Sequence, residues 1–319
     1  MIIKVECMKL ILSKKILLRV VISGLLLLLI LQKISFVEIL KIIEKANILL
    51  FLQALLLAIL FFVLKSYRLY LLAKLMVKNS EINFGTVLGS SLIGYFYNLV
   101  LPSSIGGDFV KGIYLSNRTI SKSSGIFLSF IDRVAGLYGF AVLGLLGITL
   151  VLIEKLSLPF SLLLVTLIFI FISLGISIAI LLSESLVGIA RKIKLLKFLS
   201  FFEEIDFSQK KIFFVLATVS VFFQIINVIT YIVAAKSIGI SLPFEYFYVL
   251  IPLLSLVLTL PITISGIGLR EVSAVALFYG LGVPNEKIVA MTTIIFSQFI
   301  IIGLAGGILQ IFKTDNNKL

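Results

Sequence analysis

The sequence predicts an all-α integral membrane protein with six full spans and two re-entrant, broken-helix hairpins. Three observations lead to this fold class: an apolar composition, six long apolar runs, and two further apolar regions that Pro and Gly interrupt. Of the 319 residues, 61% are hydrophobic and 13% are charged, and the mean hydropathy is +1.23. Soluble domains are about 45–50% apolar and about 25% charged. No polar stretch is long enough to cover a separate core, so we expect residues 1–319 to form a single polytopic membrane domain.

The six uninterrupted runs are each long enough to be membrane helices, because crossing about 30 Å of hydrocarbon takes about 20 helical residues. The first run follows several basic residues but carries no small-residue cleavage site, and further runs come after it. We therefore interpret it as an uncleaved first membrane helix rather than a signal peptide. The runs cover residues 16–32, 47–64, 124–153, 159–182, 212–235 and 288–312.

The two interrupted regions cover residues 84–118 and 246–283. The first breaks at 101–108, where the sequence reads LPSSIGGD, and the second breaks at 260–268, where it reads LPITISGIG. Proline ends a helix, and glycine allows the backbone to turn. Each region can therefore cross the membrane, or enter it and return on the same side.

Basic residues decide between these two paths, since cytoplasmic loops carry an excess of Lys and Arg. A full crossing at 84–101 would place the 183–211 loop outside. A re-entrant hairpin instead leaves the N-terminus, the 65–83 loop, the 183–211 loop and the C-terminus in the cytoplasm, which we expect. The basic residues of the N-terminus and of the two loops are Lys4, Lys9, Lys14, Lys15, Arg19, Lys65, Arg68, Lys74, Lys78, Arg191, Lys192, Lys194, Lys197, Lys210 and Lys211.

The two breaks resemble each other although they lie half the chain apart. Aligning Pro102 with Pro261 also pairs Gly107 with Gly266. Each half then reads span, span, interrupted hairpin, span, over about 16–153 and 159–312. Three crossings in each half give the second copy the opposite orientation, which is the inverted 3+3 repeat used by many transporters. A chance similarity between two breaks rich in Pro and Gly is the alternative.

The broken segments are the first candidates for a binding site. Non-helical backbone at membrane depth persists only where it is buried in protein or lines a wet cavity. We expect one short helix to begin near Asp108, after Gly106 and Gly107, and another to run from about Leu269 to Leu281. The free N–H groups at the start of each helix would attract an anion. Ser103 and Ser104 would add hydroxyl donors.

Charged residues gather at and near these breaks. Asp108 and Lys111 share a helical face, whereas the neighbours Arg270 and Glu271 diverge and each need another partner. Asp132-Arg133 lies deep in an apolar helix. Ionisable residues within spans indicate function by default. The structural alternative is that Asp108–Lys111 and Asp132–Arg133 neutralise one another and hold helices together.

Composition excludes several classes of site. The chain has no histidine and a single cysteine, Cys7, which rules out a zinc site or a Cys/His or Ser/His catalytic pair. The net charge of +13 raises nucleic acid as a partner. Because the basic residues lie between apolar runs, orientation in the membrane and contact with anionic lipid explain them better, and we expect no nucleic acid.

No Walker A motif is present, so transport would draw on an ion gradient, the membrane potential or the lipid gradient.

At these motifs the chain resembles the flippase-like family that includes the transmembrane region of lysylphosphatidylglycerol synthase. The matching motifs are PSSIGGDFVK at 102–111, Asp132-Arg133, GIGLRE at 266–271 and LGV at 281–283. Lys111 stands where the family has Arg, Ser265 stands where Gly is common, and Gln298 lies near the place of an expected basic residue. The synthase's soluble aminoacyl-transferase domain does not follow the last span, so we expect no lysine transfer by this chain alone.

The resemblance implies movement of an anionic phospholipid or a lipid-linked precursor between the leaflets of the cell membrane. We expect no enzymatic activity, no cofactor and no metal. Membrane lipids are the expected partners, and a separate lipid-modifying enzyme is another candidate partner. The alternatives are an ion-coupled transporter of a small anion and, less favoured, an embedded enzyme acting on polyprenyl phosphates with Asp108 or Asp132 as base. The expected substrate-binding residues are Pro102, Ser103, Ser104, Gly106, Gly107, Asp108, Lys111, Arg118, Asp132, Arg133, Pro261, Gly266, Gly268, Arg270 and Glu271.

Overall fold

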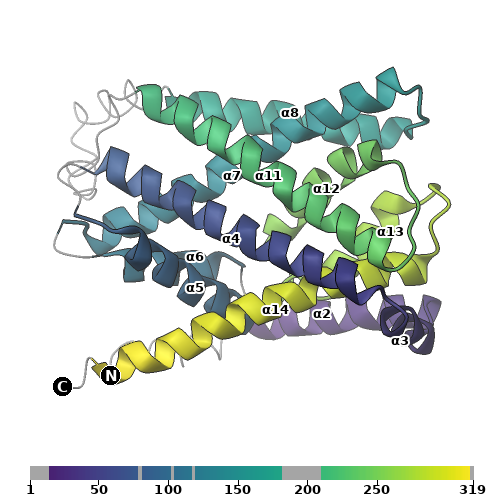
Figure 1. Ribbon diagram of the computed structural model, residues 1–319, viewed down its shortest axis with the longest axis horizontal. Helices are drawn as coiled ribbons and strands as arrows, with labels where there is room; N and C mark the ends of the chain where they lie inside the picture. The colour runs from purple at the N-terminus through teal and green to yellow at the C-terminus, as the bar shows by residue number, and fades with distance from the viewer. Residues whose placement is uncertain (1–13, 78–80, 102–103, 117–118, 182–209, 317–319) are drawn as a thin grey trace.

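The computed structural model describes residues 14–77, 81–101, 104–116, 119–181 and 210–316, and helices make up most of this part of the chain (Figure 1). The all-α class is confirmed. The helices are α2 (Lys14–Lys33), α3 (Phe36–Glu44), α4 (Ile48–Met76), α5 (Phe84–Val100), α6 (Ser104–Leu115), α7 (Lys122–Ile153), α8 (Phe160–Leu181), α11 (Lys210–Ser237), α12 (Phe244–Thr259), α13 (Leu269–Phe278) and α14 (Asn285–Asn316).

Short polar side chains fix where several of these helices begin. Asn47 precedes α4, and its side chain accepts hydrogen bonds from the backbone N–H groups of Leu49 and Leu50. Asn83 and Ser121 cap α5 and α7 in the same way. Such caps satisfy N–H groups that have no partner within the helix. The predicted starts of these helices therefore agree with the structure to within a few residues.

Many large apolar side chains are exposed and several charged ones are buried, which is the reverse of the usual pattern in a soluble protein. Leu49, Leu56 and Phe171 are exposed, whereas Arg68 and Asp132 are each only 1% exposed. This polarity suits a lipid environment, where apolar side chains face the acyl chains and ionisable ones face the bundle interior. The chain is accordingly a multi-pass membrane protein.

Within the described residues, four helices are long and apolar enough to cross a bilayer: α4, α7, α11 and α14. All four correspond to predicted spans. The other two predicted spans also form helices, α2 and α8. Their described apolar stretches, Arg19–Ile30 and Phe160–Ser173, are shorter. The total of six spans therefore stays a prediction.

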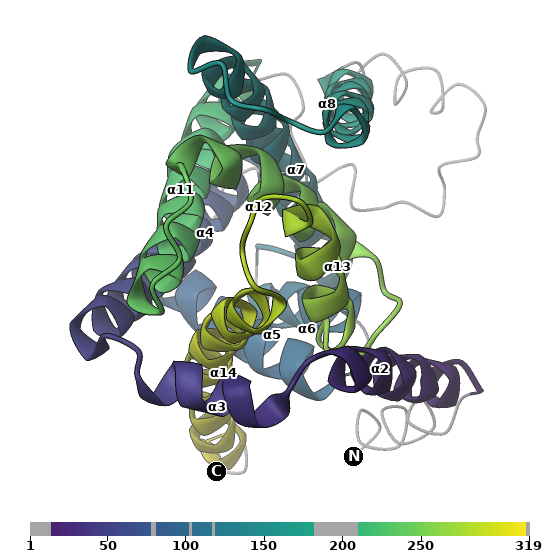
Figure 2. The same ribbon diagram turned by 90° about the vertical axis from the view of Figure 1, so that its right-hand side faces the viewer.

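The two broken regions lie toward opposite ends of the bundle. In Figure 1 the long helices run roughly along the horizontal axis, with α5 and α6 toward the left and α12 and α13 toward the right. Figure 2, which looks along that axis, places α12 and α13 near the viewer and α5 and α6 behind them. α5 pairs with α6, and α12 pairs with α13. Each interrupted region thus contains a pair of short helices that pack against each other.

Several helix bounds differ from the prediction. The segment between the first two predicted spans, residues 33–46, contains the helix α3. α13 ends at Phe278 rather than near Leu281, because the chain turns through Gly280 and Gly282 at positive φ. α6 begins at Ser104 rather than near Asp108, so Asp108 lies in the second turn of the helix and not at its N-terminus.

The largest difference is the length of α4. The prediction ended this span at residue 64 and assigned Lys65 and Arg68 to a cytoplasmic loop, but α4 continues to Met76. The loop interpretation of these two basic residues was wrong. Arg68 forms ion pairs inside the bundle, and these pairs make its burial tolerable.

Glycines let the short helix α6 approach the long helix α7 closely. A Cβ atom on Gly112 would lie 2.5 Å from the Cα of Ile126, and one on Gly125 would overlap the carbonyl oxygen of Gly112. No larger residue fits this crossing without a shift of one helix. The close approach carries Asp108 and Lys111 of α6 toward the charged residues of α7.

A cavity between the two helix breaks

The candidate functional site is a cavity of about 320 Å³ inside the bundle. Small-molecule sites typically measure about 300–1,000 Å³, so this cavity has room for a small polar group. Residues from both broken regions and from the long helices line it. Its polar lining residues are Lys65, Arg68, Tyr95, Asn98, Asp108, Asp132, Arg133, Gln224, Asn227, Thr230, Tyr231, Ser255, Thr259, Ser265, Arg270 and Gln298.

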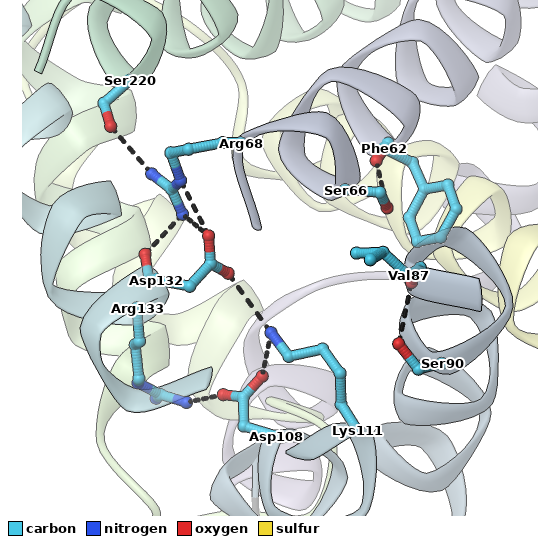
Figure 3. A network of polar contacts seen from close by, with 10 residues as sticks. All are labelled: Phe62, Ser66, Arg68, Val87, Ser90, Asp108, Lys111, Asp132, Arg133 and Ser220. Atoms are coloured by element: carbon cyan, nitrogen blue, oxygen red, sulfur yellow. Dashed lines mark hydrogen bonds and ion pairs between the residues drawn. The ribbon is translucent and has the colours of Figure 1, made fainter. Parts of the chain in front are cut away.

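One wall of the cavity is an ion pair between α4 and α7. The Nη2 atom of Arg68 lies 2.7 Å from Oδ1 of Asp132, and Nε donates to the same oxygen at 2.8 Å (Figure 3). Nη2 also donates to the backbone carbonyl of Asp132, and Nη1 donates to the hydroxyl of Ser220 at 2.9 Å. The guanidinium lies over the ring of Phe223. Nearly all of its donors are used, so Arg68 holds the wall in place.

Lys111 links this pair to the first break. Its Nζ atom lies 3.2 Å from Oδ2 of Asp132 and 3.3 Å from Oδ1 of Asp108. The expected Asp108–Lys111 contact is therefore present. Arg133 completes the chain, with Nη1 2.7 Å from Oδ2 of Asp108 (Figure 3). Each carboxylate thus contacts two basic side chains.

Asp132 and Arg133 do not contact each other, although the two charged pairs Asp108–Lys111 and Asp132–Arg133 do contact one another. Adjacent residues on a helix point about 100° apart. Asp132 accordingly faces Arg68 and Lys111, whereas Arg133 faces Asp108. The side chains of both residues contact charged residues on other helices. These partners are distant in sequence, so no local sequence pattern indicates the contacts.

The two breaks meet at the cavity. Arg133 donates from Nη2 to the carbonyl oxygen of Thr259, at the end of α12, at 2.8 Å. Ser265 lies in the second break, and its hydroxyl lies 2.9 Å from the carbonyl oxygen of Asn98 and 3.0 Å from that of Leu99, at the end of α5. These contacts satisfy carbonyl groups that lack partners at helix ends. Arg133 and Ser265 therefore tie one broken region to the other.

At the first break, one of the N–H groups that the sequence suggested for an anion is already used. The N–H of Gly107 donates to Oδ1 of Asn98 at 3.0 Å. A Cβ atom on Gly107 would overlap that same side chain and the carbonyl of Gly94. Gly107 therefore allows close packing within the hairpin. Gly106 packs against Leu101, where a Cβ atom would lie 2.8 Å from a methyl group.

At the second break the residues divide between two environments. Gly266 and Arg270 line the cavity. Gly268 instead packs against α2, where a Cβ atom would lie 3.0 Å from the carbonyl oxygen of Ser23. Glu271 accepts from the backbone N–H of Gly268 at 2.8 Å and caps its own helix. The start of α13 is thus already occupied by a carboxylate, and Glu271 lies outside the cavity lining.

Arg270 keeps unused donors inside the cavity. Its side chain is 8% exposed, and Nη2 donates to the carbonyl oxygen of Ser265 at 3.2 Å. Nε and Nη1 are buried with no hydrogen-bond partner among the described residues. The guanidinium lies 4.5 Å from the centre of the Phe296 ring. A buried cation with unused N–H groups is ready to bind an anion.

Lys65 is a cavity residue that the sequence interpretation missed, as are Arg68 and Gln298. Lys65 lies on α4, and its Nζ atom is 5.2 Å from the centre of the Tyr95 ring. Among the described residues, no carboxylate lies within 4 Å of it. A usable signal was present, since residues 48–76 contain neither Gly nor Pro and their apolar pattern continues past Arg68.

The remaining predicted site residues do not line the cavity or cannot be placed in it. Pro102, Ser103 and Arg118 lie outside the described residues, and only the backbone of Ser104 is described, as the first residue of α6. Pro261 lies in the turn that follows α12 and does not line the cavity.

The charges around the cavity do not balance. Five basic side chains surround it, from Lys65, Arg68, Lys111, Arg133 and Arg270, against the two carboxylates of Asp108 and Asp132. Lys111 reaches both carboxylates from an adjoining pocket. A surplus of positive charge in a low-dielectric interior strongly favours an anion. Within the described part of the chain, no group of three or more His, Cys, Asp or Glu residues is placed to hold a metal ion.

Comparison with known proteins gives one result that bears on identity. A search of curated proteins found no match. The family model described as the lysylphosphatidylglycerol synthase TM region matches residues 16–307. This range contains both breaks, the Asp132-Arg133 pair and most of the cavity lining. Because the match extends over most of the sequence, the chain belongs to the lysylphosphatidylglycerol synthase TM region family.

Proposed function

We propose that this protein moves an anionic phospholipid, or a lipid-linked precursor, between the leaflets of the cell membrane. The observation that carries the proposal is the surplus of positive charge in the cavity where the two broken regions meet. A membrane-lipid role is also what membership of the family suggests. The cavity residues would bind the headgroup phosphate, with Arg270 and Lys65 as its direct partners.

The physical problem in lipid movement is the headgroup and not the tails. A charged group in hydrocarbon lacks water and hydrogen-bond partners, so its crossing is slow. A polar cavity within the bundle replaces part of that hydration. Its volume of about 320 Å³ suits a headgroup, while the acyl chains would stay outside against the apolar surface of the protein.

We propose that the two broken regions are re-entrant hairpins related by an inverted repeat. Their positions toward opposite ends of the bundle support this arrangement (Figure 1). In this arrangement Arg133 and Ser265 join the hairpin tips in the state described here. Release of these contacts would open the cavity to one side. The orientation that fits the basic loops keeps both termini in the cytoplasm.

A small-anion transporter is the second candidate, because the same charges and the same volume would suit a free anion. Purified protein in proteoliposomes separates the two candidates. Movement of acyl-labelled phosphatidylglycerol between leaflets, with no uptake of radiolabelled phosphate, supports lipid transport. Phosphate uptake without lipid movement would replace the proposal with anion transport. We propose no covalent step, and an assay for products from polyprenyl diphosphate tests that statement.

A further inference from the structure

The short helix α3 lies across the bundle at the end where α14 begins. Its Ile39 belongs to the same buried cluster as Ile288 and Val289, which lie near the start of α14. Figure 2 looks along the long axis of the molecule and shows α3 lengthwise, whereas the four candidate spans run roughly along that axis. α3 therefore runs roughly parallel to the membrane surface, at the level where these spans begin or end.

One side of α3 is fixed against the protein. Ile39 is 4% exposed, and Ile42 and Ile43 pack against the same buried cluster. Just after the helix, the backbone N–H of Asn47 donates to the carbonyl oxygen of Ser237, the last residue of α11, at 2.8 Å. These contacts set the rotation of α3 about its own axis, and so they also set which side chains point away from the protein.

Three large apolar side chains lie on the outward side of α3. Phe36, Val37 and Leu40 are 58%, 59% and 51% exposed. They fall within an arc of about 100°, because each helix residue turns by about 100° from the one before it. The exposed apolar surface continues at the start of α4 with Ile48 and Leu49. Exposed apolar groups of this size on both segments indicate contact with acyl chains rather than with water.

A charged sector borders these apolar side chains. Glu38, Lys41 and the C-cap residue Lys45 are exposed, and they fall within an arc of about 60° on the remaining outward side. Glu44 is an exception, since it falls in the apolar sector, but it is the last residue of the helix. α3 therefore has one side toward the protein, one apolar side and one charged side. The last two are the pattern of a helix that lies at the boundary between headgroups and acyl chains.

From this three-sided arrangement we infer that α3 is an interfacial helix, which binds the phospholipid leaflet at the end of the bundle where α14 begins. Its apolar sector inserts about 5–10 Å into the boundary between headgroups and acyl chains, and Lys41 and Lys45 contact the lipid phosphates. A second copy of the chain fits this surface less well. Three side chains supply at most roughly a few hundred Å², against about 800 Å² per partner in a stable interface. An interfacial position for α3 requires no transport activity.

Because the sequence contains no tryptophan, a single introduced tryptophan reports the depth of α3 without background. Three full-length variants are compared in vesicles of phosphatidylcholine and phosphatidylglycerol: Phe36→Trp, Lys41→Trp and Leu56→Trp. Leu56 is 66% exposed and lies about 12 Å along α4 from its first residue, so it serves as the control within the hydrocarbon. The vesicle lipids carry bromine either near the glycerol end or near the methyl end of the acyl chains. Iodide, supplied on both sides of the membrane, quenches tryptophan that is in contact with water.

Each variant should show a different pattern of quenching. The fluorescence of Phe36→Trp should be lost mainly to bromine near the glycerol end, and that of Leu56→Trp mainly to bromine near the methyl end. The fluorescence of Lys41→Trp should be lost mainly to iodide. All three positions are on the outward sides of their helices, so the Tm of each variant should stay near that of the wild type.

A second substitution tests the apolar sector itself. Leu40→Glu, added to Phe36→Trp, places a carboxylate where the inference places acyl chains. Burying a charge there is unfavourable, so quenching by bromine should fall and quenching by iodide should rise. Leu40→Met is the matched control, because it changes the same side chain but keeps it apolar and of similar volume. It should leave both kinds of quenching unchanged.

Four outcomes would overturn the interfacial position of α3. Iodide quenching of Phe36→Trp as strong as that of Lys41→Trp would place the apolar sector in water. Quenching of Phe36→Trp by neither agent would mean that another protein surface, such as a second copy of the chain, covers it. The bromine pattern of Leu56→Trp at position 36 would place α3 within the hydrocarbon. Equal quenching with Leu40→Glu and with Leu40→Met would mean that the apolar sector does not hold α3 in the leaflet.

Discussion

Arg68 and Asp132 are 64 residues apart in sequence, yet Nη2 of the arginine lies 2.7 Å from the carboxylate, and both side chains are almost fully buried. This contact joins α4 to α7 on the wall of the cavity. Taking two charges out of water is costly, and the contact between them offsets that cost only while both are present. The pair therefore fixes the position of Asp132, whose other carboxylate oxygen contacts Lys111.

Removing one member of this pair should destabilise the protein severely. Asp132→Asn leaves Arg68 and Lys111 buried with one carboxylate fewer, and Arg68→Gln leaves Asp132 with Lys111 alone. We expect each to cost about 3–5 kcal/mol, the usual cost of a buried charge without its partner. Melting in detergent would show this as a lower Tm. In the double variant Arg68→Gln/Asp132→Asn the loss should be smaller than the sum of the two single losses. Additive losses would mean that the contact is unimportant.

The close crossing of α6 and α7 should not tolerate a larger residue. Gly125→Ala places a Cβ atom against the carbonyl of Gly112, and overpacking of this kind costs about 1–3 kcal/mol. The variant should also separate Lys111 from Asp132 and slow lipid movement. Gly175→Ala in α8 is the matched control, because no atom lies within 4 Å of its added Cβ. If the two variants had similar melting temperatures, the claim that α6 and α7 cross too closely for a larger residue would be contradicted.

The left-handed backbone conformation of Ser265 leads to a prediction about strain. Its φ angle is 54°, a left-handed conformation that costs about 1–2 kcal/mol for residues other than glycine. Ser265→Ala loses the hydroxyl contacts with the carbonyls of Asn98 and Leu99 and keeps the strain. Ser265→Gly loses the same contacts but relieves the strain. We expect the alanine variant to melt at a lower temperature than the glycine variant, and the reverse order would disprove the account of this turn.

The orientation of the first hairpin can be measured by cysteine labelling. In a chain carrying Cys7→Ser, a cysteine at Thr119 and one within 183–211 should react from the same, cytoplasmic side. The reason is that only a re-entrant 84–118 segment keeps the basic loops together. Labelling at Thr119 from the outside alone would mean that the segment crosses the membrane fully.

Local features of the sequence were enough to predict much of the fold. Uninterrupted apolar runs indicated helices α4, α7, α11 and α14, and Pro and Gly located both breaks. The end of α4 was misplaced because Lys65 and Arg68 resemble a cytoplasmic loop when their partners are unknown. A basic residue inside a span is tolerated only through a partner, and the partner of Arg68 lies three helices later in the chain.

For the site as well, the sequence indicated the residues but not their partners. Asp108, Lys111, Arg133 and Arg270 were identified because each lies at or near a break or deep in an apolar run, and the structure places them around one cavity. Their pairing could not be predicted, because it depends on which faces of distant helices meet. Gln298 was noticed only as a departure from an expected basic residue. Its unpartnered amide is visible only once α14 is packed against the cavity.

The most direct measurement of the central claim is lipid movement by wild-type protein and by Arg270→Gln in proteoliposomes, followed with acyl-labelled phosphatidylglycerol. Arg270 has two unpartnered nitrogen atoms in the cavity and no ion pair among the described residues, so its loss should affect binding more than folding. We expect expression and Tm near wild type and a rate at least about tenfold lower, the size expected for a lost charged hydrogen bond. Lys287→Gln, which removes an exposed contact to Gly239, should keep the wild-type rate. Lipid movement by Arg270→Gln at the wild-type rate would contradict the account.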